Sequence, residues 1–170
     1  MNISRNISGN ISGNISGQNE PIIYSDGTQC WYKDINIHRE NDLPDVIEAD
    51  ADGTLKWYKD GYIHRENDLP AIIYSDGTQC WYKNGDIHRE NDFPSIIEAN
   101  RTQKWYKNGK CHRGNDLHAI IDAKGARQWY KDGYIHRDHL PAVIQANGTQ
   151  KWYKNGKCYY EKKQSKCAIM

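Results

Sequence analysis

The sequence predicts an all-β protein, an array of about six antiparallel β-hairpin repeats that forms a single-layer meander or solenoid. Three observations support this fold class. The tryptophans recur at spacings of 26, 24, 24, 24 and 23 residues, and a fixed period of this size is the signature of a repeat array. A typical period holds two Asp-Gly or Asn-Gly dipeptides, which favour hairpin turns. The stretches between these dipeptides are rich in Trp, Tyr and Ile, as strands are.

Residues 21–160 are predicted to form the repeat domain, because all six copies fall within them. Two-residue turns are expected at Asp26-Gly27, Asn84-Gly85, Asp132-Gly133 and their equivalents, since these dipeptides tolerate the positive φ angles of a type I′ turn. No single hairpin can cover its own apolar face, so stacking must provide the stability. With about two strands per repeat at ~4.8 Å each, the array should be roughly 55 to 60 Å long.

The predicted register follows from these turns. Counting outward from the second turn of the third repeat pairs Tyr82 with Ile87, and counting back from the first turn pairs Ile73 with Cys80. The Ile73 position is Ile in every copy, whereas the next position varies and is often acidic. We therefore expect one buried row of isoleucines and one exposed row of acidic residues. The buried row is Ile23, Ile47, Ile73, Ile97, Ile121 and Ile144, and the exposed residues are Glu48, Glu98 and Asp122.

The two ends of the chain differ from the repeats in composition. Residues 1–20 are a polar, low-complexity tail with repeated Asn-Ile-Ser, which predicts disorder. In the last copy Tyr159-Tyr160 replace His-Arg, as is typical of a capping repeat. Residues 161–170 form a basic tail. The chain therefore divides into a disordered tail, a repeat domain and a basic C-terminal segment.

The repeat motif resembles a known family. The run Trp-Tyr-Lys-Asn-Gly-x-x-His is similar to the MORN-type β-hairpin repeat. The run His-Arg-Glu-Asn-Asp-Leu-Pro-Ala resembles more closely the repeat proteins of giant amoeba-infecting DNA viruses, although Arg follows His where the MORN pattern has Gly. MORN repeats are chiefly scaffolding and membrane-proximal interaction modules. The resemblance therefore implies a viral protein with a binding or structural role and no catalysis.

The last four residues, Cys167-Ala168-Ile169-Met170, fit the C-a-a-X rule for prenylation, and the terminal Met favours a farnesyl group on Cys167. Lys162, Lys163 and Lys166 precede it. A single lipid binds reversibly, and each basic residue near an anionic leaflet adds about 1 kcal/mol. The lipid and the lysines together predict a peripheral protein on the cytoplasmic face of an anionic membrane, in the host cytoplasm if the protein is viral.

A ladder of Trp, His and Arg recurs with the repeat and is the candidate interaction surface. Equivalent histidines about 10 Å apart cannot share a metal ion, so no metal or cofactor is expected. A structural role is expected instead, with His against the partner Trp and Arg paired with the Asp of the next turn. The ladder consists of Trp31, Trp57, Trp81, Trp105, Trp129, Trp152, His38, His64, His88, His112, His136, Arg39, Arg65, Arg89, Arg113 and Arg137.

These patterns favour a non-catalytic scaffold or protein-interaction module. The alternative is an aromatic ladder that binds glycans or choline-like head groups; exposed Trp rings would favour the ladder and buried rings the scaffold. The net charge of +1 provides no global field for nucleic acid. Five Cys with no CxxC pair predict reduced thiols. The open sheet edges favour an edge-paired homo-oligomer.

Overall fold

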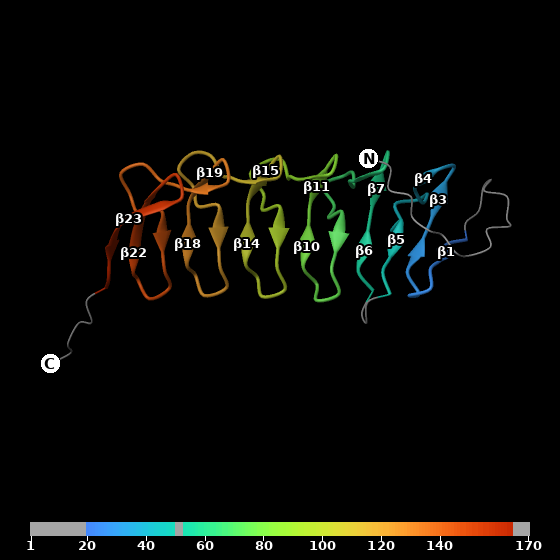
Figure 1. Ribbon diagram of the computed structural model, residues 1–170, viewed down its shortest axis with the longest axis horizontal. Coiled ribbons are helices and arrows are strands. Elements are labelled where there is room, and N and C mark those ends of the chain that lie inside the picture. The colour runs from blue at the N-terminus through green and yellow to red at the C-terminus, as the bar shows by residue number, and fades with distance from the viewer. Residues whose placement is uncertain (1–19, 50–52, 165–170) are drawn as a thin grey trace.

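The computed structural model describes residues 20–49 and 53–164, which form a long, open β-structure (Figure 1). None of these residues is helical, and 13 strands form one antiparallel sheet in the order β1-β2-β5-β6-β9-β10-β13-β14-β17-β18-β21-β22-β23. The predicted all-β class and the open antiparallel hairpin array are confirmed. The expected disorder of the N-terminal tail concerns residues outside those described, apart from the exposed Glu20.

The large sheet is built from very short strands. They are β1 (Ile22–Ile23), β2 (Gln29–Cys30), β5 (Val46–Ile47), β6 (Leu55–Lys56), β9 (Ile72–Ile73), β10 (Gln79–Cys80), β13 (Ile96–Ile97), β14 (Gln103–Lys104), β17 (Ile120–Ile121), β18 (Arg127–Gln128), β21 (Val143–Ile144), β22 (Gln150–Lys154) and β23 (Lys157–Lys162). Each repeat adds one hairpin of this sheet, and each hairpin pairs with its neighbours.

A second row of hairpins lies along one side of the large sheet, at the top in Figure 1. Its strands pair as β3 (Tyr32–Lys33) with β4 (Asn36–Ile37), β7 (Tyr58–Lys59) with β8 (Tyr62–Ile63), β11 (Tyr82–Lys83) with β12 (Asp86–Ile87), β15 (Tyr106–Lys107) with β16 (Lys110–Cys111), and β19 (Tyr130–Lys131) with β20 (Tyr134–Ile135). The upper edge is the row of turns at residues 33–36, 59–62, 83–86, 107–110, 131–134 and 154–157. We number the repeats 1 to 6 by these turns.

The turns of the upper edge have the predicted geometry. Asn84 and Gly85 both have positive φ, 51° and 89°, as a type I′ turn requires. The turn pairs Tyr82 with Ile87, and the amide of His88 donates to the Trp81 carbonyl at 3.1 Å. The predicted register of this hairpin is therefore confirmed.

The predicted register of the other hairpin is wrong by one residue. Ile72 pairs with Cys80, and Ile73 pairs with Gln79 instead of Cys80. A one-residue slip exchanges the two faces of a strand, so it changes which side chains are buried.

The cause of the slip is the loop length. The Tyr74 amide donates to the Thr78 carbonyl, and the Gly77 amide donates to the Tyr74 carbonyl, each at 2.9 Å. Gly77 alone carries the positive φ, 86°, whereas Asp76 does not. This is a three-residue loop in which a turn is followed by a left-handed glycine, and its odd length shifts the register.

The burial of the isoleucine row is also corrected. Ile23 is 65% exposed, and the other five predicted isoleucines are only half-buried. The preceding position is deeper, with Ile72 3% and Val46 6% exposed. The acidic residues that we expected in solvent, Glu48, Glu98 and Asp122, are half-buried as well. Two of them form ion pairs across the sheet, Glu48 with Lys56 and Glu98 with Lys104.

Strand β23 ends the array. It pairs Gln150 with Lys162, where Gln79 of the third repeat pairs with Ile97 of the fourth. The Tyr160 ring lies against Trp152, with ring centroids 4.9 Å apart. β23 thus occupies the position that the first strand of a further repeat would take, and its lysines face an edge that would otherwise invite pairing.

We predict that Arg101→Gly stabilises the protein. Arg101 has φ 72° at the loop position that is Gly27, Gly53, Gly77, Gly125 or Gly148 in the other repeats. A left-handed conformation costs a non-glycine residue about 1 to 2 kcal/mol, partly offset by the chain entropy of glycine. Urea unfolding should show a gain of about 1 kcal/mol. Arg127→Gly, within strand β18, should destabilise, and equal losses in both variants would contradict the prediction.

Candidate functional site

The tryptophans of the predicted ladder form the core. Trp31, Trp57, Trp81, Trp105 and Trp129 are 4 to 7% exposed, and Trp152 in the last repeat is half-buried. The Trp81 indole N–H donates to the Asp68 carbonyl of the preceding repeat at 2.9 Å. The equivalent pairs are Trp57 with Asp42, Trp105 with Asp92, and Trp129 with Asp116.

The arginines of the ladder cover these rings. The Arg89 guanidinium carbon lies 3.8 Å from the centre of the Trp81 ring. Its Nε and Nη2 donate to the two carboxylate oxygens of Asp68, both at 2.8 Å. We expected the Asp of the next turn as the partner, but the carboxylate belongs to the preceding repeat. The equivalent ion pairs are Arg65 with Asp42, Arg113 with Asp92, and Arg137 with Asp116.

Each of these arginines joins three repeats. Besides its own Trp81 and the preceding Asp68, Arg89 donates from Nη1 to the Pro94 carbonyl of the following repeat at 3.3 Å. Its side chain is only about one-seventh exposed. Bidentate carboxylate binding and stacking on an indole ring both require the planar guanidinium. These arginines therefore hold successive repeats of the array together.

These contacts shift the titration of the aspartates. Hydrogen bonds from Arg65, Arg89, Arg113 and Arg137 hold the pKa of Asp42, Asp68, Asp92 and Asp116 below the ordinary Asp value. A carboxyl whose folded pKa is lowered adds stability above its unfolded pKa, about 3.9. That contribution is lost as the pH falls through the lower, folded pKa.

Four histidines of the ladder, His64, His88, His112 and His136, contact the upper-edge turn of the next repeat. His88 Nδ1 accepts a hydrogen bond from the Asn108 amide of the next repeat at 3.3 Å, and His88 Nε2 lies 3.2 Å from Glu90. Hydrogen bonds between a His Nδ1 and the next turn also join His64 to Asn84, His112 to Asp132, and His136 to Asn155. The predicted placement of His against Trp is therefore replaced by a contact with the next turn.

One histidine outside the predicted ladder does contact tryptophan. His118 stands where repeats 2, 3, 4 and 6 begin with Pro44, Pro70, Pro94 and Pro141. Its ring makes edge contacts with Trp105 and Trp129, at centroid distances of 6.3 and 5.5 Å. Burial, and then the charge of Arg113, lower the pKa of His118.

The buried cysteines line the same interior. Burial raises the pKa of the Cys80 thiol to about 11 and that of Cys111 to about 12. A thiol with a raised pKa is a poor nucleophile at neutral pH. Across residues 20–49 and 53–164, no three or more His, Cys, Asp or Glu side chains gather where they could hold a metal ion.

A hollow of about 590 Å³ separates the upper parts of repeats 1 and 2, lined by Ile37, Trp57 and both His38 and His64. At later junctions a turn glycine donates to the preceding hairpin, as Gly85 does to the Ile63 carbonyl at 3.0 Å. Repeat 1 has Ile35, which is 90% exposed, where the other repeats have this glycine.

The charges divide along the chain, which the net charge of +1 conceals. Residues 1–93 contain 16 Asp and Glu against 8 Lys and Arg, whereas residues 94–170 contain 6 against 15. On the upper edge Lys33, Lys59 and Lys83 pair with Glu40, Glu66 and Glu90. The residue corresponding to these glutamates is Gly114 in repeat 4 and Asp138 in repeat 5. A charge count by halves would have revealed this polarity from the sequence.

The candidate lipidation segment is described only in part. Lys162 ends β23 and Lys163 is exposed, whereas Lys166 and Cys167 lie outside the described residues. Among the residues that the structure describes, there is no helix of the length and apolarity needed to cross a membrane.

Comparison with protein-family models finds no family that matches the chain. Comparison with curated proteins finds no match either. The resemblance to MORN repeats therefore rests on the sequence motif.

We predict that Arg113→Lys destabilises the protein, although it keeps the charge. Lysine cannot make the two-pronged contact with Asp92 or cover the Trp105 ring, so the loss should be about 1 to 3 kcal/mol. Urea unfolding followed by Trp fluorescence measures it. The control is Arg127→Lys at an exposed position, which should change stability by less than about 0.5 kcal/mol.

A second prediction concerns Asp45, which is 2% exposed where the fourth repeat has Ser95. Its carboxylate accepts hydrogen bonds from the Tyr58 and Arg39 amides, but burial raises its pKa above the ordinary value. A carboxyl with a raised folded pKa binds protons more tightly in the folded state, so its contribution to stability increases as the pH falls.

The wild type should therefore gain stability relative to Asp45→Ser between about pH 7 and about pH 4. Chemical unfolding of both proteins across this range measures the difference. The aspartates paired with arginine are common to both proteins and cancel in this comparison. A difference that stays constant, or that moves in favour of Asp45→Ser on acidification, would contradict the prediction.

Proposed function

We propose that the chain is a non-catalytic repeat scaffold, a protein-interaction module tethered to the cytoplasmic face of a membrane by farnesylation of Cys167. The observation that carries the scaffold is the Arg ladder, because its members use their charge and hydrogen bonds within the array. Arg89, for example, is committed to Asp68, Trp81 and Pro94. Such a construction supplies length and stiffness, and leaves recognition to the exposed edges.

The burial of the indole rings supports the scaffold over the aromatic-ladder alternative. A ring that stacks on a sugar or encloses a quaternary ammonium must expose a face to the ligand. In the first five repeats the Trp rings are 4 to 7% exposed, and a guanidinium covers each of them. A glycan or choline-like ligand would have to displace these arginines.

The membrane anchor is supported by the sequence of the C-terminal tail and by the end of the array. Cys167 is the fourth residue from the C-terminus, and Lys162, Lys163 and Lys166 precede it. Lys162 ends the edge strand β23 and Lys163 follows it directly, so a lipid on the tail would place this end of the array at an anionic leaflet. The motif resemblance to MORN repeats and to viral repeat proteins is consistent with this membrane-proximal role.

We predict that Cys167→Ser releases the protein from membranes when it is made in a eukaryotic cell. The thiol is the atom that a prenyl transferase alkylates. Three lysines alone give only about 1 kcal/mol each, an attraction that salt weakens. Fractionation should find the variant mostly soluble, and intact mass should show a farnesyl group only on the wild type.

The matched control is Cys158→Ser, which removes an exposed thiol nine residues upstream and leaves the C-a-a-X box intact. This variant should remain at the membrane. Replacing Lys162, Lys163 and Lys166 together should give a partial loss of membrane binding. If wild type and Cys167→Ser fractionate alike and neither carries the lipid, the anchoring proposal is wrong.

A further inference from the structure

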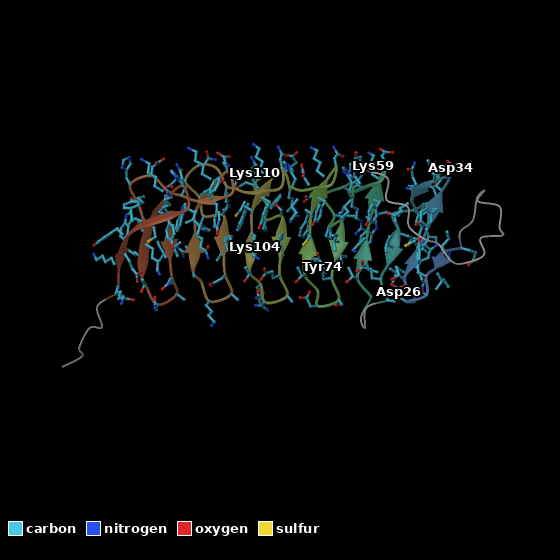
Figure 2. All side chains as sticks on the ribbon, in the orientation of Figure 1. Asp26, Asp34, Lys59, Tyr74, Lys104 and Lys110 are labelled. Carbon is cyan, nitrogen blue, oxygen red and sulfur yellow. The ribbon has the colours of Figure 1, made fainter. Side chains whose placement is uncertain are left out.

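The upper edge presents side chains and no unpaired strand. Each of its turns begins with a lysine, and the fourth residue of the turn varies from repeat to repeat. From repeat 1 to repeat 6 these fourth residues are Asn36, Tyr62, Asp86, Lys110, Tyr134 and Lys157, and all are exposed. In Figure 2, Asp34, Lys59 and Lys110 lie along this edge, whereas Tyr74 and Asp26 lie towards the other side. A partner of the upper edge must therefore recognise side chains.

Two exposed aromatic rings stand on this edge at symmetric positions. Tyr62 and Tyr134 are each 61% exposed, and they belong to repeats 2 and 5. Each leans over the turn of the next repeat: a Cβ atom added at Gly85 would lie 3.3 Å from the Tyr62 ring, and one added at Gly156 would lie 3.5 Å from the Tyr134 ring. The two rings are thus equally far from the boundary between repeats 3 and 4. Exposed Tyr rings are typical anchors of protein interfaces.

The charges of the upper edge are opposite on the two sides of the same boundary. In repeats 1 to 3 each turn lysine is neutralised by its glutamate, and Asp34, Asp60 and Asp86 remain in excess. In repeats 4 to 6 the lysines outnumber the acidic residues, which are Asp132 and Asp138. The lysines are Lys107, Lys110, Lys131, Lys154 and Lys157. Counted this way, the edge carries an excess of three negative charges on one half and three positive charges on the other.

We infer that the upper edge is a self-association surface on which a second copy of this chain docks antiparallel, about a two-fold axis between repeats 3 and 4. That axis maps repeat 3 onto repeat 4, repeat 2 onto repeat 5, and repeat 1 onto repeat 6. Asp86 then faces the second copy's Lys110, Tyr62 faces its Tyr134, and Asn36 faces its Lys157. An isologous dimer uses each contact twice, so every match is doubled.

The opposite arrangement has no such match. A parallel alignment of two upper edges places Asp86 against Asp86 and Lys110 against Lys110, so like charges meet along the whole edge. The lysine that begins each turn meets a lysine in either arrangement, so these lysines do not choose between the two directions. In the antiparallel arrangement the acidic residues meet only at repeats 2 and 5, with Asp60 near Asp132, and there the two tyrosines supply apolar contact. The charges therefore favour the antiparallel direction, and Tyr62 and Tyr134 provide apolar contact in the middle repeat of each half.

The expected complex is salt-sensitive. An edge roughly 55 to 60 Å long and one row of turns wide buries an area at the small end of stable interfaces. Its ionic contacts are exposed at the rim, where salt screens them. The turns of the upper edge do not include Cys167, so the dimer does not depend on the lipid anchor.

The first experiment is sedimentation velocity on the full chain made in bacteria, which carries no farnesyl group, at about 50 mM and about 500 mM salt. We expect a concentration-dependent dimer that weakens at high salt. Lys110→Glu should raise the dissociation constant at least about tenfold, because two symmetric contacts are reversed. The matched control is Lys124→Glu, the same change on a loop of the opposite side, which should leave the dimer intact.

Compensation separates a specific contact from a general charge effect. Asp86→Lys alone should weaken the dimer, and combining Asp86→Lys with Lys110→Asp should restore it. Tyr62→Ser and Tyr134→Ser should each weaken association, whereas Tyr74→Ser, an exposed tyrosine away from the upper edge, should not. A strict monomer at low salt, or a dimer indifferent to these changes, would overturn the inference.

Cross-linking tests the direction. In a background of Cys158→Ser and Cys167→Ser, a Tyr62→Cys protein mixed with a Tyr134→Cys protein should form a disulfide between the two chains. Tyr62→Cys alone should not, because residues of repeats 2 and 5 lie about 30 Å apart along the edge. Cross-linking of Tyr62→Cys with itself would show a parallel complex and would overturn the antiparallel arrangement.

Discussion

The contact on which the array depends is the guanidinium that joins three successive repeats. Arg89 stacks on the Trp81 ring of its own repeat, holds both oxygens of Asp68 from the repeat before, and donates to the Pro94 carbonyl of the repeat after. In a simple repeat protein each unit is coupled only to its neighbours, so stability is a sum of nearest-neighbour terms. An arginine that reaches both sides links two junctions at once. Loss of one arginine therefore weakens a longer stretch of the array than loss of one core contact.

The fold could be predicted from the sequence because the repeat period and the turn dipeptides are local signals. The Asn84-Gly85 turn was predicted correctly, since both of its residues adopt positive φ. The Asp76-Gly77 turn was not, because the hydrogen bond between Tyr74 and Thr78 lengthens the loop to three residues. Asp-Gly fits either loop, and only the pairing of the whole strand decides between them. The resulting one-residue shift moves Ile73 out of the core, where the two-residue turn would have placed it, and buries Ile72 instead.

The sequence predicts which residues form the ladder, but it does not predict which residues they contact. The recurrence of Trp, His and Arg identified the ladder, yet the partner of each arginine lies about 21 residues earlier in the chain, in another repeat. Local spacing carries no information about that choice, which depends on how the repeats stack. The division of charge between the halves was present in the sequence, but a net charge of +1 averaged it away.

Repetition also explains which positions can differ from one repeat of the chain to the next. The core positions must satisfy the same contacts in every repeat, so Trp81 and Arg89 have equivalents that differ little. The fourth residue of each upper-edge turn is exposed, and it changes from Asn36 to Tyr62 to Asp86 along the first half alone. An exposed row of fixed spacing can therefore vary without disturbing the core. The backbone repeats along the array, but the side chains of this row can differ between its two ends. Such a row can therefore distinguish a parallel from an antiparallel partner.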